Sequence, residues 1–335
     1  MKNKYFFRAI LLNAIHHSGV EKYGKGAMSL NIPESVFHEP MTLVPISHVN
    51  DWLRDIETST NDPDYMLHLA VPIDIGRRGV LSRWFFSGHD LAATIRRINT
   101  SISCFQSGVF LGGAVSGPYM KWVYDNKAVA PDVKVHDGIR CAIFLTKVLR
   151  RYLGEQFNPT LVRLPGKRTN TSAYNQFFGC EVEWNQPSTE VWFHSKLRMT
   201  TALYGRQEKK QLAMSYGELD DILNMPSPED ELKVVYETIN YSRHLGMPKV
   251  AIVAEMLGLS VQQFQRRLRT QNLDFTTLMS YVLSNTAVNL FAKGLGIETV
   301  AQQLGYTNTA SFTRMFKKNR GVTPSQYIEM FHDSF

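Results

Sequence analysis

Two glutamines and an arginine occupy one face of an expected helix near the C-terminal end of the chain. These residues are Gln262, Gln265 and Arg266. The apolar residues Val261, Phe264 and Leu268 recur at helical spacing and should face the interior. An α-helix fits the major groove of DNA, where Gln pairs with adenine and Arg with guanine through two hydrogen bonds. This face is therefore predicted to read base edges; a solvated polar face is the alternative.

A second expected helix repeats the arrangement with smaller residues. Its outward positions are Ala310, Thr313 and Arg314, and Arg314 follows Arg266 by 48 residues. Methyl groups of alanine and threonine suit contact with the methyl group of thymine. Basic residues near the ends of both helices are expected to contact phosphates, which position a protein without reading sequence. They are Arg269, Lys317, Lys318 and Arg320. For each of them a solvated basic helix end is the alternative.

A repeated helix–turn–helix pattern would position both sets of residues. The first copy reads Ala254-Glu255-Met256-Leu257-Gly258-Leu259-Ser260 and the second reads Ala301-Gln302-Gln303-Leu304-Gly305-Tyr306. The offset between the alanines is 47 and that between the arginines is 48, so the extra residue falls in the turn. We expect a first helix at 250–256, with Ser260 capping the next helix and Asn308 capping its counterpart. Such units present their second helix to the major groove.

One long helix is expected between the two copies. It should cover residues 275–293, with Asp274 as its N-cap and Gly294 at its end. At about 1.5 Å per residue it spans roughly 25–30 Å. That length would hold two reading helices about one DNA turn apart. A tail helix should follow, with Thr323 as cap and Pro324 at its first position.

The stretch from residue 235 to residue 331 resembles the DNA-binding domain of the AraC/XylS family of bacterial transcription regulators. The motifs that carry the resemblance lie at 300–306, 311–317 and 321–327, and in the first half at 253–254, 257–260 and 264–268. The resemblance implies an all-α domain and places the groove contacts at Gln262, Gln265, Arg266, Ala310, Thr313 and Arg314. The chain departs from the family at 261–263, where an early basic residue is usual, and near Leu283, where an arginine is usual. No target sequence is therefore carried over.

The other two-thirds of the chain mixes helical and strand-like patterns. Helices are expected from Asp90 to about residue 103 and over 138–153, and residues 5–15 read as a core helix. Strands are expected at 119–124, 161–164, 182–184 and 191–194. This mixture predicts an α+β domain, and an acidic stretch broken by Pro226-Ser227-Pro228 predicts a linker, with an exposed loop within a longer helical connector as the alternative. The expected division is a regulatory domain at 1–217, a linker at 218–231 and a DNA-binding domain at 232–335.

This α+β segment resembles the "arabinose-binding" type N-terminal domain of one branch of the same family. The resemblance covers about residues 46–197 and rests on Asn61-Asp62-Pro63-Asp64-Tyr65, Leu67-His68-Leu69 and Tyr174-Asn175-Gln176-Phe177-Phe178-Gly179-Cys180-Glu181-Val182. Asp62-Pro63-Asp64 is typical of a helix start. The resemblance implies a domain that senses a small effector or dimerises, and it does not imply that arabinose binds.

Catalytic and metal-binding patterns are not expected in this segment. Cys104, Cys141 and Cys180 are far apart and odd in number, which indicates neither a metal site nor full disulfide pairing. Neither the glycine-rich stretch at 107–117 nor Gly166-Lys167-Arg168-Thr169 matches a phosphate-binding loop. We expect strand edges at the first and a basic surface loop at the second. The chain is therefore not expected to be an enzyme or to hold a metal or cofactor, and the residues of an effector site stay open.

The net positive charge of the chain is consistent with a polyanionic partner, and its hydropathy pattern bears on membrane binding. The chain has a formal net charge of +7, and residues 249–335 carry nine Lys or Arg against five Asp or Glu. No run approaches the roughly 20 apolar residues that span a bilayer. We therefore expect a cytoplasmic protein with no membrane partner.

These patterns predict a transcription regulator whose partner is double-stranded DNA. Activation is the output that the family resemblance implies, with RNA polymerase as a further partner. The N-terminal domain is expected to bind a small effector, of unknown identity, or a second copy of the chain. The alternatives are a ligand-independent regulator whose N-terminal domain only dimerises, and a repressor. Two other classes of protein are further alternatives. The first is an enzyme with an appended DNA-binding domain, which the spacing of the cysteines opposes. The second is a scaffold that binds protein, which would show no salt-sensitive affinity for DNA.

Overall fold

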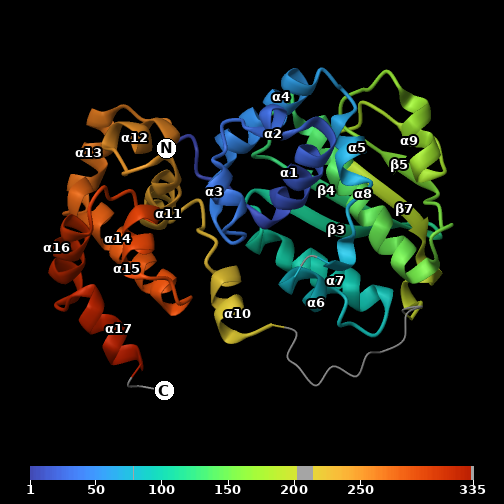
Figure 1. The fold of residues 1–335 in the computed structure, drawn as a ribbon. Helices are drawn as coiled ribbons and strands as arrows, with labels where there is room; N and C mark the ends of the chain where they lie inside the picture. Colours follow the sequence, from blue (N-terminus) through green and yellow to red (C-terminus); the bar gives the residue numbers. More distant parts are fainter. Residues whose placement is uncertain (78, 202–213, 333–335) are drawn as a thin grey trace. The chain divides into compact units, whose positions relative to one another are not determined.

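The computed structural model describes residues 1–77, 79–201 and 214–332. They form two compact units (Figure 1). Unit 1 contains Met1–Tyr5, Thr42–Ser47 and Pro226–Phe335, and unit 2 contains Phe6–Met41 and His48–Met225. Unit 1 is therefore assembled from segments that lie far apart in the sequence, whereas the two segments of unit 2 are separated only by Thr42–Ser47.

Unit 1 is almost entirely helical. Its helices are α11 (Glu231–Ser242), α12 (Val250–Met256), α13 (Val261–Thr270), α14 (Phe275–Ala292), α15 (Ile297–Gln303), α16 (Thr309–Arg320) and α17 (Pro324–His332). The short strand β2 (Leu43–Pro45) packs against α11. The central helix α14 contacts α11, α15 and α16. The expected elements of this region are confirmed, including the cap of α14, because the Asp274 carboxylate accepts a hydrogen bond from the Thr277 amide at 2.9 Å.

The second half of unit 1 is organised around an apolar cluster. Leu283, Ala287 and Leu290 of α14 meet residues of α15 and α16, and Phe312 and Phe316 are fully buried there. Phe291 lies edge-on to Phe316 with ring centroids 5.7 Å apart. Burial of such aromatic and aliphatic surface is the main stabilising contribution to a small helical domain.

Unit 2 contains a five-stranded sheet with strand order β3-β4-β7-β5-β6. The strands are β3 (Val109–Ser116), β4 (Tyr119–Asn126), β5 (Leu161–Arg163), β6 (Val182–Glu183) and β7 (Thr189–His194). Neighbours pair antiparallel except β5 and β6, which are parallel. Alternate residues of β4 are buried, and the long helix α8 (Lys134–Leu153) packs against β4 and β7. The expected α+β class and the four expected strands are confirmed.

Most of the remaining helices of unit 2 lie around this sheet and α8, and α10 stands apart from both (Figure 1). They are α1 (Ile10–Tyr23), α2 (Lys25–Met28), α3 (Glu34–Phe37), α4 (Ile46–Thr60), α5 (Tyr65–Ala70), α6 (Val80–Phe85), α7 (Leu91–Ser101), α9 (Thr171–Phe178) and α10 (Tyr216–Leu223). The first two residues of α4 group with unit 1. In the described part of the chain, no helix combines the length and the apolar character needed to cross a membrane.

The expected core helix at 5–15 is only partly right. Residues Phe6–Arg8 form the strand β1, and the helix α1 begins at Ile10. The reason is Arg8, whose side chain is 2% exposed. Its guanidinium donates hydrogen bonds to the carbonyl oxygens of Cys104, Met41 and Ile222. A buried arginine needs such partners, and these lie far away in the sequence.

The expected linker at 218–231 is also partly helical. Its acidic first half belongs to α10, which begins with a capping box between Ser215 and Glu218. The two units meet in the sequence at Met225 and Pro226, inside the expected linker. The expected domain boundaries placed Met1–Tyr5 and Thr42–Ser47 in the regulatory domain, whereas the structure groups both segments with unit 1. The last three residues of the expected DNA-binding domain, 333–335, lie outside the described residues.

Candidate DNA-binding surface

The two helix–turn–helix units of unit 1 share the same backbone turn. Gly258 and Gly305 both take a positive φ, of 66° and 83°. After each glycine the next amide donates to an alanine carbonyl 2.9 Å away: Leu259 to Ala254, and Tyr306 to Ala301. The left-handed conformation is costly for residues with a Cβ atom, which explains the glycine in both copies.

Each reading helix begins at a side-chain cap. Ser260 Oγ accepts a hydrogen bond from the Gln263 backbone amide at 3.2 Å. The Gln263 side chain in turn accepts one from the Ser260 backbone amide, which completes a capping box. Asn308 Oδ1 accepts from the Ser311 amide at 2.8 Å. One extra residue, Thr307, stands between the turn and the second cap. The offset therefore changes from 47 to 48 in the turn, as expected.

The structure places all six expected base-reading residues on the outer faces of α13 and α16. Gln262, Arg266, Ala310 and Arg314 are exposed, and Gln265 and Thr313 are half-buried. Phe264 and Leu268 of α13, and Phe312 and Phe316 of α16, are buried on the opposite faces. Figure 1 shows both helices along the same outer side of unit 1. The two halves of the repeat thus expose equivalent arginines from one helical framework.

Two arginines of α13 and α16 make side-chain contacts within unit 1. Arg314 Nη2 donates to Ser311 Oγ at 3.0 Å, one helical turn earlier. The neighbour Arg267 is exposed, and it forms an ion pair with Glu231 of α11 at 2.8 Å. Arg267 therefore ties α13 to α11, although the sequence places it beside Arg266. The pattern of charges alone did not reveal this pairing.

The four expected phosphate contacts separate into two kinds. Arg269, Lys317 and Lys318 are exposed. Arg320 is half-buried and donates to Asn285 Oδ1 of α14, while Asn285 donates to Tyr236 Oη at 3.2 Å. Arg320 Nε is buried without a partner among the described residues. Unlike the other three, Arg320 is therefore engaged inside the domain and joins α16 to α14.

The N-terminal arm, Met1–Tyr5, packs against the first helix–turn–helix unit. The Lys2 amide donates to the Leu257 carbonyl at 3.2 Å, and Asn3 Nδ2 donates to the Met256 carbonyl at 2.8 Å. Both carbonyls lie at the end of α12, where a helix leaves acceptors unpaired. Sequence reasoning missed this contact because nothing near Lys2 or Asn3 signals a partner more than 250 residues away.

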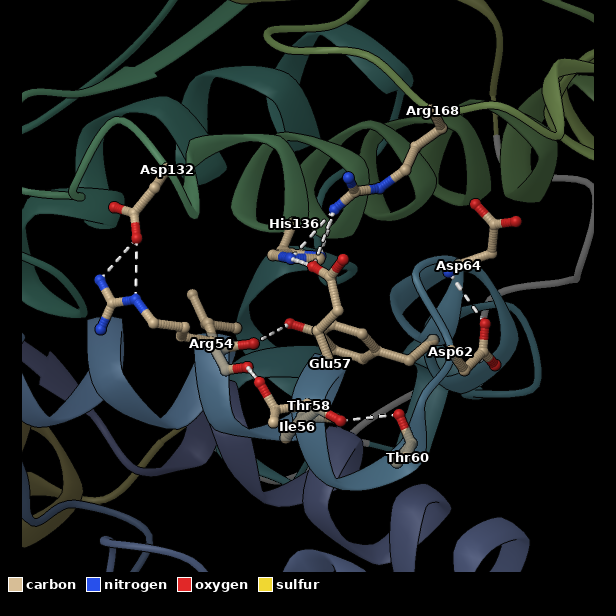
Figure 2. Close-up of polar contacts among 12 residues, drawn as sticks. Arg54, Ile56, Glu57, Thr58, Thr60, Asp62, Asp64, Asp132, His136 and Arg168 are labelled. Carbon is tan, nitrogen blue, oxygen red and sulfur yellow. Dashed lines mark hydrogen bonds and ion pairs between the residues drawn. The ribbon is translucent and has the colours of Figure 1, made fainter.

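A polar cluster in unit 2 connects α4, α8 and the loop that carries Arg168 (Figure 2). His136 Nε2 lies 2.7 Å from Glu57 Oε2, and Arg168 Nη2 lies 3.1 Å from His136 Nδ1. Burial, followed by the charge of Arg168, lowers the pKa of His136 to about 3. Arg168 Nη2 is also 3.0 Å from Nε2; in the tautomer with the proton on Nε2, the neutral imidazole donates to Glu57 and can accept from Arg168 at Nδ1. The expected basic surface loop at 166–169 is therefore wrong for Arg168, which turns inward to these partners, and right for exposed Lys167.

The two motifs that suggested the N-terminal domain meet at Asp64. The Asp62 carboxylate accepts from the Asp64 amide at 2.9 Å just before α5, which fits the expected helix start (Figure 2). Tyr174 Oη donates to Asp64 Oδ1 at 2.7 Å, and this joins α9 to the start of α5. These contacts join α9 to the start of α5 and have a structural role.

The described residues contain no group of three or more His, Cys, Asp or Glu that could hold a metal ion. The three cysteines are free thiols. Burial raises the pKa of the Cys141 thiol far above its usual range, so this group is not a nucleophile.

Family models match both parts of the chain. One is described as "Arabinose-binding domain of AraC transcription regulator, N-term" and matches residues 28–201. Another, described as "Helix-turn-helix domain", matches residues 253–330, which include both turns and both reading helices.

Curated relatives match over shorter stretches. The uncharacterized HTH-type transcriptional regulator Rv1395 of Mycobacterium tuberculosis is 35% identical over 81 residues, which are 24% of this chain and 24% of its own length. The transcriptional activator AggR and the DNA-binding dual transcriptional regulator Rns, both of Escherichia coli, are 29% identical over 83 residues, 24% of this chain and 31% of theirs. The chain thus matches 24–31% of the length of these relatives.

A solved structure aligns over a larger part of the chain. The transcriptional regulator CdpR from Pseudomonas aeruginosa covers 79% of this chain with 85% of its own, at 18% identity and a TM-score of 0.34. That likeness is too weak to carry an argument.

The matched models and curated relatives are transcription regulators and not enzymes. Since the model of the N-terminal domain alone covers more than half of the 335 residues, the chain belongs to the AraC family of transcription regulators, in the branch with an arabinose-binding type N-terminal domain.

Proposed function

We propose that this chain is a sequence-specific DNA-binding transcription regulator that reads two successive major-groove segments. The observation that carries the proposal is the equivalent placement of Arg266 and Arg314, each exposed on a capped helix that follows the same glycine turn. Arginine in the major groove discriminates guanine through two hydrogen bonds. Gln262, Gln265, Ala310 and Thr313 supply the neighbouring contacts, and Arg269, Lys317 and Lys318 contact phosphates.

Activation is the proposed output. AggR is named a transcriptional activator and Rns a dual transcriptional regulator, which supports activation and leaves repression as the alternative. An activator acts with RNA polymerase, which we propose as a further partner. We propose a cytoplasmic location, which agrees with DNA as the partner.

Control is proposed to act through unit 2. A small effector that binds the folded unit would stabilise it and change how the reading helices meet DNA. The competing proposal is a unit that only dimerises. A thermal-shift screen separates them, because a ligand that binds only the native state raises the melting temperature whereas a purely dimerising unit responds to protein concentration.

Genome-wide mapping of bound DNA, followed by gel-shift assays on the sites recovered, tests the main proposal. We expect a site with two conserved segments about one helical turn apart, on one face of the duplex. The double variant Arg266→Ala, Arg314→Ala should lose preference for that site and keep residual non-specific binding. Equal affinity of the double variant and the unaltered chain for the mapped site would refute the proposal.

A further inference from the structure

The sheet of unit 2 has a long strand at one of its edges. This strand is β3, and among the described residues it pairs with β4 alone. The pairing runs without interruption from Val109 opposite Asn126 to Ser116 opposite Tyr119. The eight residues of β3 include no charged residue and no proline. Edge strands of native sheets are usually protected by charge, proline, a bulge or short length, and β3 has none of these devices.

The opposite edge of the same sheet is protected. It is formed by β6, which is two residues long, and Glu183 of this strand forms an ion pair with Arg163 at 2.6 Å. On β3, by contrast, Phe110 is 58% exposed and Val115 is 67% exposed. A long edge strand with exposed apolar side chains is a template to which a further strand can add.

Alternate residues of β3 present their backbone groups to the outside of the sheet. A two-residue turn, Gly117 and Pro118, joins β3 to β4, so Ser116 and Tyr119 close the hairpin. In an antiparallel pair, residues that bond to the neighbouring strand alternate with residues that do not. The residues in phase with Ser116 therefore bond to β4, and the others face outward: Val109, Leu111, Gly113 and Val115. Within the described residues, no backbone hydrogen bond outside the hairpin reaches this set.

We propose that β3 pairs antiparallel with β3 of a second copy of this chain. With Gly112 of both copies on a two-fold axis, Val109 meets Val115 and Leu111 meets Gly113. Every outward N–H group of one copy then has an outward C=O group of the other as its acceptor. The contact is isologous, as two-fold dimer interfaces are. The inference rests on the proposed control through unit 2, and it names the partner as a second copy and the surface as β3.

The side chains suit the same register. Phe110 lies opposite Ala114 of the second copy, so a large side chain meets a small one. The row across the sheet that contains this pair has Asp125 at one end and Lys121 of the second copy at the other. Like charges therefore do not face each other, which would oppose pairing. A strand of unrelated sequence would match neither the alternation of sizes nor the charges, which favours a second copy as the occupant.

Sedimentation equilibrium of the full chain without DNA tests whether two copies associate. We expect a dimer whose dissociation constant changes less than about twofold between about 0.1 and 0.5 M salt, because β3 has no charged residue. Val115→Lys should weaken the dimer at least about tenfold, since a lysine on an edge strand opposes pairing. Met199→Lys is the matched control: Met199 is 71% exposed in the same unit, and its replacement should leave the dimer intact.

A disulfide locates the two-fold axis. In a chain with Cys104→Ser and Cys180→Ser, Gly112→Cys should form a crosslinked dimer on oxidation. The two Gly112 residues form a non-hydrogen-bonded pair in the proposed register, with Cα atoms about 4.5 Å apart, a distance that a disulfide spans. The added side chain approaches only the end of the Phe110 ring, which is exposed and can turn.

Ser116→Cys in the same background is the matched control. It lies on the same face of β3, but eight strand steps of about 3.3 Å would separate the two copies of this residue by about 26 Å. A monomeric chain, a dimer that Val115→Lys leaves intact, or equal crosslinking at positions 112 and 116 would overturn the proposal. The reading function is measured separately by gel shift. A monomer that keeps its sequence preference would refute this inference alone, whereas a dimer without sequence preference would refute only the proposed reading of DNA.

Discussion

At the scale of single residues, the surface of unit 1 contains basic side chains with three different roles. Arg266 and Arg314 are exposed on the reading faces, Arg267 is paired with Glu231, and Arg320 is engaged with α14. Side chains of one type thus differ in whether they are available to DNA. Helical spacing predicted the outward placement of the reading residues correctly. It did not predict the pairing of Arg267 or Arg320, because both partners lie on other helices.

Replacing a reading arginine should weaken specific binding and relax sequence preference. Arg266→Ala or Arg314→Ala is expected to cost about 1–3 kcal/mol at the mapped site, since each removes a bidentate contact with one base. Gel-shift titration against sites with single base changes measures this. Arg267→Ala is the matched control and should leave base preference unchanged. An equal loss of preference in the control would contradict the groove assignment.

Lys318 and Arg320 should respond differently to removal of their charge. Lys318→Ala should weaken binding to all sequences and lower the slope of log affinity against log salt by about one, as expected for one lost phosphate contact. Arg320→Ala should mainly lower the free energy of unfolding of unit 1, because Asn285 loses its donor. Salt titration and chemical denaturation separate the two effects. If Lys318→Ala lowers the affinity for the specific site and leaves the affinity for other sequences unchanged, Lys318 is not a simple phosphate contact.

The stability of unit 2 should fall in mild acid because of His136. Its folded pKa is about 3, whereas a histidine in the unfolded chain titrates near 6.5. Between these values the unfolded chain binds a proton that the folded chain does not, so the free energy of unfolding rises with pH. The groups that face His136 are Glu57, Arg168 and Tyr65, with Asp132 acting at longer range. The stability that neutral His136 contributes is thus full above about pH 6.5 and is lost toward pH 3, by about 2 kcal/mol at pH 5.

Urea unfolding between pH 7 and pH 5 measures this dependence. His136→Gln should reduce this dependence, even if the variant is less stable at pH 7, and leave the part that comes from His16. A second buried histidine, His16, has a pKa lowered to about 4, mainly by burial, so His16→Gln should remove the part of the slope that remains in His136→Gln. An unchanged slope in His136→Gln would show that other groups dominate the acid response.

At the scale of elements, local sequence signals predicted the helices of the repeated helix–turn–helix region and, in unit 2, helices α7 and α8 and strands β4 to β7. Caps such as Ser260, Asn308 and Asp274 act through the chain immediately after them, and they begin helices where expected. The errors came where a distant contact decides the structure. Arg8 is pulled into the interior by three carbonyl groups, and the acidic stretch at Glu218 became a helix that pairs with Arg83.

The turn of the second helix–turn–helix unit should tolerate no side chain at Gly305. Its φ is 83°, and an added Cβ atom would lie 2.6 Å from the Met247 amide nitrogen. Gly305→Ala should lower the free energy of unfolding by about 3 kcal/mol, from backbone strain and overpacking together. Gly321 has a similar φ of 79° with open space around the added atom, so Gly321→Ala should cost only about 1 kcal/mol. Similar losses in both variants, measured by denaturation, would argue against the close approach of the backbone.

At the scale of the whole molecule, the order of segments along the chain differs from their grouping in space. Unit 1 takes its arm and its strand β2 from the first 47 residues, while its helices come from the last part of the chain. From the sequence we predicted two domains, each formed by one uninterrupted stretch of chain. Periodicity and composition could not show otherwise, because they describe only residues that are neighbours along the chain. The contacts of β2 with α11 are long-range, and one sequence contains no local sign of them.

Two buried valines near the N-terminus should therefore stabilise different units. Val36 of α3 and Val44 of β2 are both 0% exposed and only eight residues apart, yet they belong to unit 2 and unit 1. Replacing either with Ala removes two buried methyl groups and should cost about 2 kcal/mol. Hydrogen exchange should show faster opening of α11 and α14 in Val44→Ala, and of α1 and α4 in Val36→Ala. If Val44→Ala instead loosens the helices around the sheet and leaves α11 protected, β2 belongs energetically to unit 2, and the DNA-binding unit does not depend on the N-terminal segments.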